Sequence, residues 1–274
     1  MMESPVKPII HFVHGNSFPS GTYRVFLEQL SERYTVWTTD MVGHDPKYPV
    51  TDGWRFLVQE LIDTLSARYS EPVILVGHSL GGILSLMAAR ARPDLVRAVV
   101  VLDSPIVAGW RAFLLRMFKW LKLDKKFSPA RFAEKRKHIW KDKEAAYQHF
   151  SSKEIFAIWP PEVLWDYLHA GLEPCPEGVT LRFKREVETA IYRTLPHGLG
   201  RLVRRPPAMP VGFVGGTESI ECAQAGDFYT RQLMEPHYTL IQGGHLIPME
   251  APEKTAGAVL AMLDSFQLQA VKQT

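Results

Sequence analysis

The feature that most constrains this chain is the pentapeptide Gly77-His78-Ser79-Leu80-Gly81, which has the pattern Gly-x-Ser-x-Gly. An apolar run at 72–76 precedes it, and a segment with helical character at 83–92 follows at once. The order strand, sharp turn, helix puts the serine on a strained turn, where its hydroxyl projects above a sheet. The glycines let the strand and helix backbones pass closely. We therefore predict that Ser79 is a nucleophile; the simpler interpretation is an ordinary glycine-rich turn.

Apolar runs alternate with segments of helical periodicity at both ends of the chain. Six strands are predicted, at 8–13, 34–39, 72–76, 98–102, 211–214 and 237–241. Helices are predicted at 21–33, 52–69, 80–92, 223–234 and 252–268. This alternation predicts an α/β fold with a parallel sheet covered on both faces. In such sheets the chemistry lies at the carboxyl ends of the strands, where His14, Ser79 and Asp103 are all found.

The alternation stops in the middle of the chain. The segment 106–205 is more basic than the rest and holds five of the seven tryptophans. Helical pieces are predicted in it at 110–123, 129–138, 143–150 and 161–170. We interpret 106–205 as a helical cap inserted into a core that is formed by 1–105 and 206–274.

Charge and composition argue against several classes of protein. The net charge of +3 is too small to indicate a nucleic-acid partner. The two cysteines, Cys175 and Cys222, have no metal-ligand spacing and favour a reducing compartment over a disulfide framework. The first residues lack the pattern of a signal peptide, and no apolar run is long enough to span a bilayer. We expect a cytoplasmic protein that uses neither a cofactor nor a metal.

Together these residues resemble the α/β-hydrolase fold family. The resemblance rests on His14-Gly15 after the first strand, on the pentapeptide at 77–81, and on Gly243-Gly244-His245 before a helix that begins with Pro and Glu. It covers nearly the whole chain, and the order Ser, acid, His also matches the family. Most members carry two more strands at the N-terminus. Here the first strand already bears the His-Gly motif, so the resemblance implies six main strands, all parallel.

The resemblance implies that His245 is the base that takes the proton from Ser79 as the serine attacks. His245 is the one histidine of the ten in the glycine-flanked loop where the family has its catalytic histidine. We expect His78 to pack or hydrogen-bond near the turn, and His14 to hold the loop of the oxyanion hole.

Two candidates remain for the carboxylate that orients this histidine. The family usually takes its acid from the turn after the fifth predicted strand, where one count gives Ser219 and another gives Glu218. The family's other position is the end of the strand after the elbow helix, which is Asp103 here. A similar pattern, with serine in the usual place and aspartate after the earlier strand, marks a subgroup of bacterial and mitochondrial esterases. We favour Asp103 and keep Glu218 as the alternative.

The resemblance also implies an oxyanion hole, which needs two backbone N–H groups aimed at the developing negative charge. The residue after the nucleophile, Leu80, supplies one of them. The loop after His14-Gly15 supplies the other, from Asn16.

The leading hypothesis is a serine hydrolase of the carboxylesterase type that works through an acyl-enzyme on Ser79. Hydrolysis of a thioester or of a carbon–carbon bond on the same triad stays open, and so does a non-catalytic, ligand-binding member of the fold. The aromatic residues of 106–205 favour a small-molecule ester with an apolar portion. The basic face at 111–126 is interpreted as solvated rather than as a membrane contact. The sequence does not predict the oligomeric state.

Overall fold

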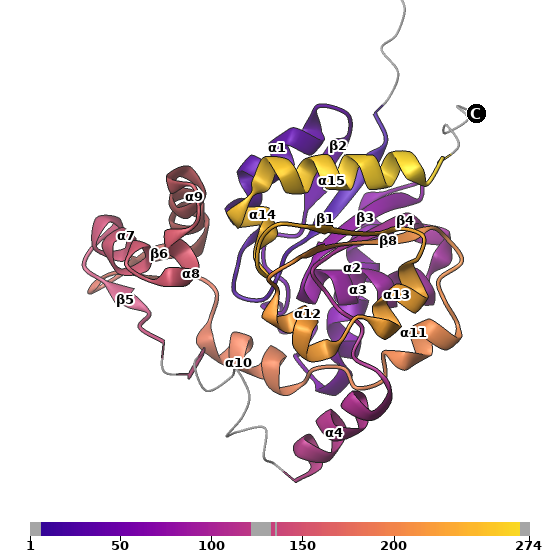
Figure 1. Ribbon diagram of the computed structural model, residues 1–274. Coiled ribbons are helices and arrows are strands. Elements are labelled where there is room, and N and C mark those ends of the chain that lie inside the picture. Colours follow the sequence, from indigo (N-terminus) through magenta and orange to yellow (C-terminus); the bar gives the residue numbers. More distant parts are fainter. Residues whose placement is uncertain (1–6, 122–132, 135, 269–274) are drawn as a thin grey trace, which may run out of the picture.

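A parallel six-stranded sheet forms the centre of the computed structural model, which describes residues 7–121, 133–134 and 136–268 (Figure 1). The strand order is β2-β1-β3-β4-β8-β9, and every pairing between neighbours is parallel. The strands are β1 (Ile9–Val13), β2 (Thr35–Thr38), β3 (Val73–His78), β4 (Val96–Leu102), β8 (Val211–Gly216) and β9 (Tyr238–Ile241). The predicted fold class is confirmed.

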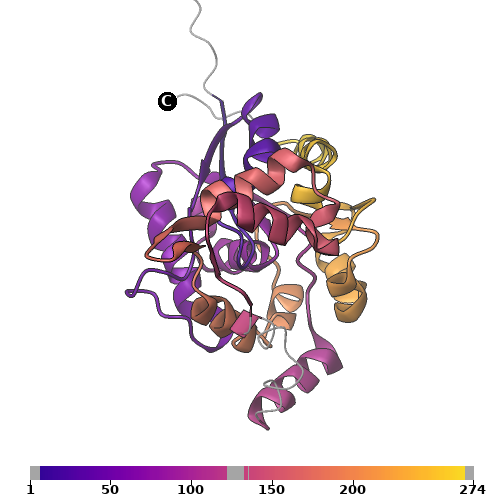
Figure 2. The ribbon, with the colours of Figure 1, turned by 90° about the vertical axis from the view of Figure 1, so that its left-hand side faces the viewer.

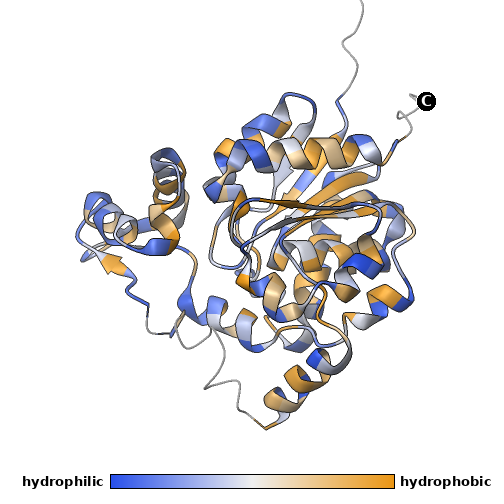
Figure 3. Cartoon of the chain, in the orientation of Figure 1, coloured by the Kyte–Doolittle hydropathy of each residue, from blue (hydrophilic) through white to orange (hydrophobic). Residues whose placement is uncertain are grey.

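Helices cover both faces of this sheet. On one face lie α1 (Arg24–Ser31) and α15 (Pro252–Ser265); on the other lie α2 (Arg55–Arg68), α3 (Leu80–Ala91) and α13 (Phe228–Met234) (Figure 1). Successive side chains of a strand point to opposite faces, so Ile74 and Val76 pack with the first layer and Val73 and Leu75 with the second. Burial on both faces explains why the inner strands are continuous apolar runs, which Figure 3 shows in orange.

Short helices complete the core. They are η1 (Ser20–Tyr23), η2 (Asp52–Trp54), η3 (Pro93–Leu95), α12 (Ile220–Ala225) and α14 (Ile247–Glu250). Two of the predicted elements are divided in the structure: the helix at 223–234 becomes α12 and α13, and the loop at 243–250 contains α14. Within the described ranges, no helix combines the length and apolar character needed to cross a bilayer.

The segment 106–205 mixes helices with a small antiparallel sheet of order β5-β7-β6. Its elements are α4 (Gly109–Trp120), β5 (Ile139–Trp140), α7 (Lys143–Ser151), α8 (Glu154–Ala157), α9 (Pro161–Gly171), β6 (Leu172–Cys175), β7 (Gly178–Leu181), α10 (Arg185–Arg193) and α11 (Gly200–Arg204). Only helices were predicted here, because strands of two to four residues interrupted by proline and glycine give no periodic signal. Parts of the predicted helices at 110–123 and 129–138 (residues 122–123, 129–132 and 135) lie outside the described residues.

Helix α9 joins this segment to the core. It packs on η1 so closely that a Cβ added to Gly21 would lie 2.7 Å from the Cβ of Ala170. Phe18, in the loop before η1, contacts the rings of Trp159 and Tyr167. Figure 2 shows the part of this segment with α7, α8 and α9 lying in front of the sheet, whereas α4 projects below it. The segment therefore lies over the loop that follows β1.

Candidate active site

Ser79 occupies a sharp turn between β3 and α3. Its φ is +51°, in the region that non-glycine residues rarely adopt. A Cβ on Gly77 would collide with the carbonyl of Gly81, and a Cβ on Gly81 with the carbonyl of Val13. The glycines of the pentapeptide are therefore required by close backbone contacts, and the turn leaves the Ser79 hydroxyl at the carboxyl end of β3.

Three side chains from three separate strand ends form one hydrogen-bonded chain. Nε2 of His245 lies 3.0 Å from Oγ of Ser79, and Nδ1 of His245 lies 2.7 Å from Oδ1 of Asp103. Asp103 directly follows β4, and His245 follows β9. Because Nδ1 faces a carboxylate, it carries the ring proton, and Nε2 is left to accept the proton of the serine hydroxyl. The structure thus brings together the three residues that the sequence singled out.

Asp103 is fully buried, and other donors hold its carboxylate in place. The N–H of Gly216 donates to Oδ2 at 2.7 Å, and the hydroxyl of Ser219 donates to Oδ1 at 2.6 Å. Burial would raise the pKa of Asp103, but the bond and charge of His245, with the donors Ser219 and Gly216, hold that pKa below its ordinary value. Ser219, at the family's usual acid position, thus supports the aspartate on the neighbouring strand.

A second carboxylate, which the sequence reasoning missed, lies near the imidazole. Oε2 of Glu221 is 3.8 Å from Nδ1 of His245. Burial lowers the pKa of His245, but the hydrogen bond with Asp103 and the charges of Glu221, Asp103 and Glu250 outweigh it, so the pKa lies above its ordinary value. Glu221 is two residues beyond Ser219, in the first turn of α12.

The alternative acid, Glu218, is exposed on the same turn. Its backbone N–H donates to the carbonyl of Gly243 at 2.9 Å. Among the described residues its side chain makes no ion pair within 4.0 Å with His245, whereas Asp103 and Glu221 both do. The structure does not bring Glu218 to the imidazole.

His14 holds the loop after β1 in the way that was expected. Its Nδ1–H donates to the carbonyl of Gly15 at 2.7 Å, and its Nε2 accepts from the N–H of Val42 at 2.8 Å. Burial lowers the pKa of His14 to about 4, so the ring is neutral near pH 7. A neutral ring with one donor and one acceptor satisfies both contacts.

His78 connects the loop after β1 to the loop of His245. The Tyr23 hydroxyl accepts from the N–H of Gly15 at 2.9 Å and donates to Nδ1 of His78 at 2.8 Å. Nε2–H of His78 donates to the carbonyl of His245 at 3.0 Å. Burial and the neighbouring His245 lower the pKa of His78 to about 3, which keeps the ring neutral. This chain through Tyr23 was not predicted, because it joins residues that are far apart in the sequence.

The two predicted oxyanion donors lie at the start of α3 and in the loop after β1. Leu80 is the first residue of α3, so its N–H has no carbonyl one turn earlier in the helix. Among the described residues, neither this N–H nor that of Asn16 has a hydrogen-bond acceptor in the protein. The side chain of Asn16 is buried and donates to the carbonyl of Glu188 in α10 at 3.3 Å. Both backbone donors are therefore free to bind a ligand oxygen.

One group of metal-type ligands occurs within the described ranges: Asp103, Glu221 and His245, whose ligand atoms lie within 4.8 Å of one another. A metal ion there would have to displace the 2.7 Å hydrogen bond between Asp103 and Nδ1 of His245. Both carboxylate oxygens of Asp103 already accept hydrogen bonds, from Gly216, Ser219 and His245. We interpret the group as a hydrogen-bonded pair with a nearby second carboxylate.

One known family matches most of the chain. The model of the alpha/beta hydrolase family matches residues 12–258. The chain belongs to the alpha/beta hydrolase family. The resemblance inferred from the sequence is confirmed, and the matched range includes the serine turn, the end of β4 and the loop of His245.

Curated relatives of this alpha/beta hydrolase align over shorter stretches. A 2-(acetamidomethylene)succinate hydrolase of Mesorhizobium japonicum is 36% identical over 102 residues, 35% of this chain and 35% of that protein. A pimeloyl-[acyl-carrier protein] methyl ester esterase of Chromobacterium violaceum is 33% identical over 101 residues, 36% and 38% of the two chains. A monoglyceride lipase of Rattus norvegicus is 30% identical over 111 residues, 38% and 37%. The chain thus spans little more than a third of each relative.

Solved structures match over nearly the full length. An E-2-(acetamidomethylene)succinate hydrolase has a TM-score of 0.75 at 23% identity, covering 95% of this chain and 93% of that one. A peroxisomal alpha-beta-hydrolase of Saccharomyces cerevisiae has a TM-score of 0.76 at 14% identity, covering 99% and 80%. At these identities the likeness establishes the fold of this alpha/beta hydrolase.

Proposed function

We propose that this protein is a serine hydrolase that cleaves a carboxylic ester through an acyl-enzyme on Ser79. The observation that carries the proposal is the hydrogen-bonded chain from Ser79 Oγ through His245 to the buried Asp103, at 3.0 and 2.7 Å. A serine hydroxyl is a poor nucleophile until a base removes its proton, and a positioned imidazole with a carboxylate behind it does this in unrelated folds.

In the first half of the reaction, Oγ of Ser79 attacks the ester carbonyl carbon while Nε2 of His245 takes the hydroxyl proton. The carbonyl oxygen becomes an oxyanion, which accepts hydrogen bonds from the backbone N–H groups of Leu80 and Asn16. Losing one such donor typically costs about 3–4 kcal/mol of transition-state stabilisation. Asp103 keeps the imidazole in the reactive tautomer and stabilises the imidazolium.

The intermediate then expels the alcohol, which takes the proton from the imidazolium of His245 and leaves the acyl group on Ser79. In the second half a water molecule gives its proton to Nε2 and attacks the acyl carbon. The carboxylic acid departs and the proton returns to Ser79. The steps balance without a cofactor.

We infer further that 106–205 acts as the cap over this site and contacts the substrate. The ring of Trp159 contacts Phe18 in the loop after β1 and packs on Phe156, and these aromatic rings suit an apolar portion of a small-molecule ester. Buried polar atoms without a hydrogen-bond partner in the described structure, such as Tyr167 Oη and Thr189 Oγ1, also occur in this segment. Such atoms favour a substrate with a polar group as well.

The test is turnover on a panel of 4-nitrophenyl esters, an acyl thioester and a carbon–carbon substrate with a vinylogous diketone. We expect ester hydrolysis to exceed the other two reactions and to fall to background in Ser79→Ala. Ser66→Ala, at an exposed serine of α2, is the matched control and should keep wild-type turnover. Preference for the thioester or the diketone would reassign the substrate class, and no turnover of any substrate would favour a non-catalytic member.

A further inference from the structure

A cavity lies at the far end of α3 from Ser79. Its volume is about 840 Å³, and it opens between α3, the start of α2, the first half of α4 and the segment that includes α11. None of Ser79, Asp103 and His245 lines it. Met87 and Arg90 line it, and they lie eight and eleven residues beyond Ser79, so about 12 and 16 Å along the helix axis. The cavity is separate from the proposed catalytic site.

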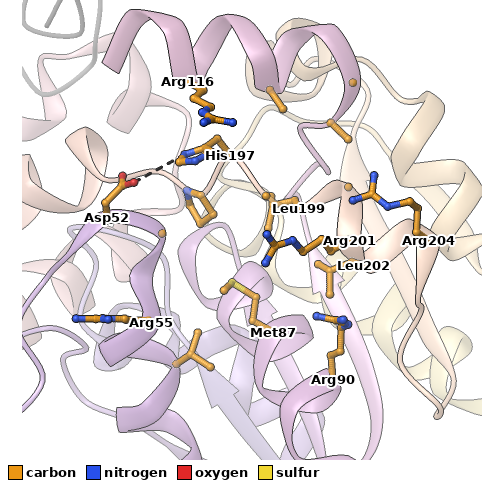
Figure 4. A pocket seen from close by; sticks show the side chains of 18 of the residues that line it. Asp52, Arg55, Met87, Arg90, Arg116, His197, Leu199, Arg201, Leu202 and Arg204 are labelled. Atoms are coloured by element: carbon orange, nitrogen blue, oxygen red, sulfur yellow. Dashed lines mark ion pairs between the residues drawn. The ribbon is translucent and has the colours of Figure 1, made fainter. Parts of the chain in front are cut away.

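The rim of this cavity is strongly basic. Five arginines line it: Arg55, Arg90, Arg116, Arg201 and Arg204. Figure 4 shows four of them, from α3, α4 and α11, placed around the same hollow. The only carboxylate in the lining, Asp52, is already paired with Lys119 and lies 3.8 Å from Nδ1 of His197.

In the described ranges, these arginines lack the carboxylate partners that other arginines of the chain have. Arg24, Arg33 and Arg231, for example, each pair with one or two carboxylates. Within the part of the chain that the structure describes, none of the five rim arginines has a carboxylate within 4.0 Å, although they are brought together from four helices. Nδ1 of His197 is buried and also lacks a hydrogen-bond partner there. The fold therefore gathers five guanidinium groups that have no carboxylate partner among the described residues.

The floor of the cavity is apolar. Buried side chains contribute to its lining, namely Val58, Ala108, Ala112, Leu199 and Leu202. The cavity volume falls in the range of sites that hold small organic molecules. An apolar floor beneath a cationic rim fits a ligand with an anionic group at one end and an apolar portion at the other.

We propose that this cavity binds the phosphate group of an organic phosphate whose apolar portion lies on the floor. A phosphate presents several oxygens to several planar guanidinium groups at once, and arginine recognises it through paired N–H···O bonds. A ligand with a single carboxylate would leave most of the rim arginines without a counter-charge. The site is independent of ester cleavage at Ser79 and goes beyond it.

Two sources can supply such a ligand, a soluble organic phosphate and a phospholipid headgroup. Phe113 of α4 is exposed and lines the cavity, Trp110 is exposed on the same helix, and Figure 3 shows hydrophobic residues along this helix. The shared chemistry is a phosphate on an apolar carrier. The test therefore has one arm for each source.

In the first arm, octyl phosphate is titrated into the full-length protein by calorimetry, with octanol as the uncharged comparison. In the second, sedimentation is measured with vesicles of phosphatidylcholine containing phosphatidylglycerol, against phosphatidylcholine alone. We expect binding in at least one arm that weakens at high salt, because exposed arginines carry it. In the double variant Arg90→Gln/Arg201→Gln, the Kd for that probe should rise about tenfold or more.

Arg205→Gln is the matched control, because Arg205 is exposed and adjacent in sequence but does not line the cavity. It should change the Kd less than about twofold. Thermal unfolding checks that the double variant is folded, and Arg116→Gln serves as a second variant from another helix. The proposal is overturned if neither probe binds, or if binding is equally strong in the folded cavity variants. Turnover of a small ester should be the same in the wild type and in all of these arginine variants. A loss of phosphate binding can therefore be distinguished from a loss of catalysis at Ser79.

Discussion

Asp103 and Glu221 act on one imidazole from different distances. Asp103 is buried and lies 2.7 Å from Nδ1 of His245, whereas Glu221 lies 3.8 Å away with about half of its side chain exposed. A hydrogen bond at the shorter distance fixes the ring and its tautomer. A charge at the longer distance changes the proton affinity of the ring without orienting it.

Asp103→Asn should therefore lower kcat for a 4-nitrophenyl ester by about three to four orders of magnitude, because the amide favours the wrong tautomer of His245. Glu218→Gln should leave kcat within about twofold of wild type, because its exposed side chain makes no contact with the ring. Steady-state kinetics of the two purified variants decide the matter. The opposite ranking would give the role to Glu218.

Glu221→Gln tests the second carboxylate through the pH profile. His245 must be neutral to act as a base, so activity is lost as the pH falls through its raised pKa. Removing the charge of Glu221 lowers that pKa, and the acidic limb of kcat/KM should move to lower pH. An unmoved limb, or a shift to higher pH, would mean that Glu221 does not act on the ring.

Among the individual site residues, those that follow strand ends could be predicted from the sequence. Ser79, Asp103 and His245 could be found because a parallel sheet gathers its carboxyl ends at one edge. Glu221 and Tyr23 were missed because their contacts depend on side-chain directions, which no motif encodes. Ser219 was noticed as a residue that could not carry the charge, and the structure gives it the role of donor to Asp103.

Among the elements, η1, the end of β3 and the loop before α14 are linked by Tyr23 and His78. The hydroxyl of Tyr23 joins the N–H of Gly15 to the ring of His78, and all of these groups are buried. The link joins the loop of the proposed oxyanion hole to the backbone of His245. It should set the position of both parts of the site relative to Ser79.

Tyr23→Phe should therefore destabilise the fold by about 1–3 kcal/mol, the cost of leaving buried groups unpaired, and should lower kcat more than it changes KM. Tyr48→Phe is the control, because Tyr48 donates to Asp63 at the exposed side of α2. Chemical denaturation and ester kinetics measure both effects. A variant with lower stability but wild-type kcat would limit Tyr23 to a structural role.

The elements of the sheet were predictable and those of 106–205 were less so. The four inner strands are mostly apolar runs, and burial on both faces makes such runs visible. The edge strands β2 and β9 have four residues each and were marked by their β-branched and aromatic residues. The strands β5, β6 and β7 have two to four residues, and their pairing depends on contacts between distant segments. Periodicity carries no information about such pairing.

For the whole molecule, a buried glutamate couples stability to pH. Glu60 of α2 is buried and accepts from the N–H of Gly43 at 3.1 Å. Burial raises the pKa of Glu60 from 4.5 to about 7. Between these values the folded state holds the proton more tightly than the unfolded state, so the free energy of unfolding falls as the pH rises.

Glu60→Gln should remove this penalty while it keeps an oxygen to accept from Gly43. We expect the variant to exceed wild type by on the order of 1–3 kcal/mol at pH 8 and to match it near pH 4, where both side chains are neutral. Denaturation curves at the two pH values measure the difference, with the exposed Glu71→Gln as control. Equal stability at pH 8 would show that Glu60 is ionised in the fold at no cost.

The most direct test of the central claim is covalent labelling with a fluorophosphonate, read by intact mass and peptide mapping. If Ser79 is a nucleophile activated by His245, the folded protein should gain one adduct on Ser79. The adduct should be absent from Ser79→Ala and present in Ser66→Ala. A folded wild-type protein that takes no label, or a label that persists in Ser79→Ala, would contradict the proposed chemistry.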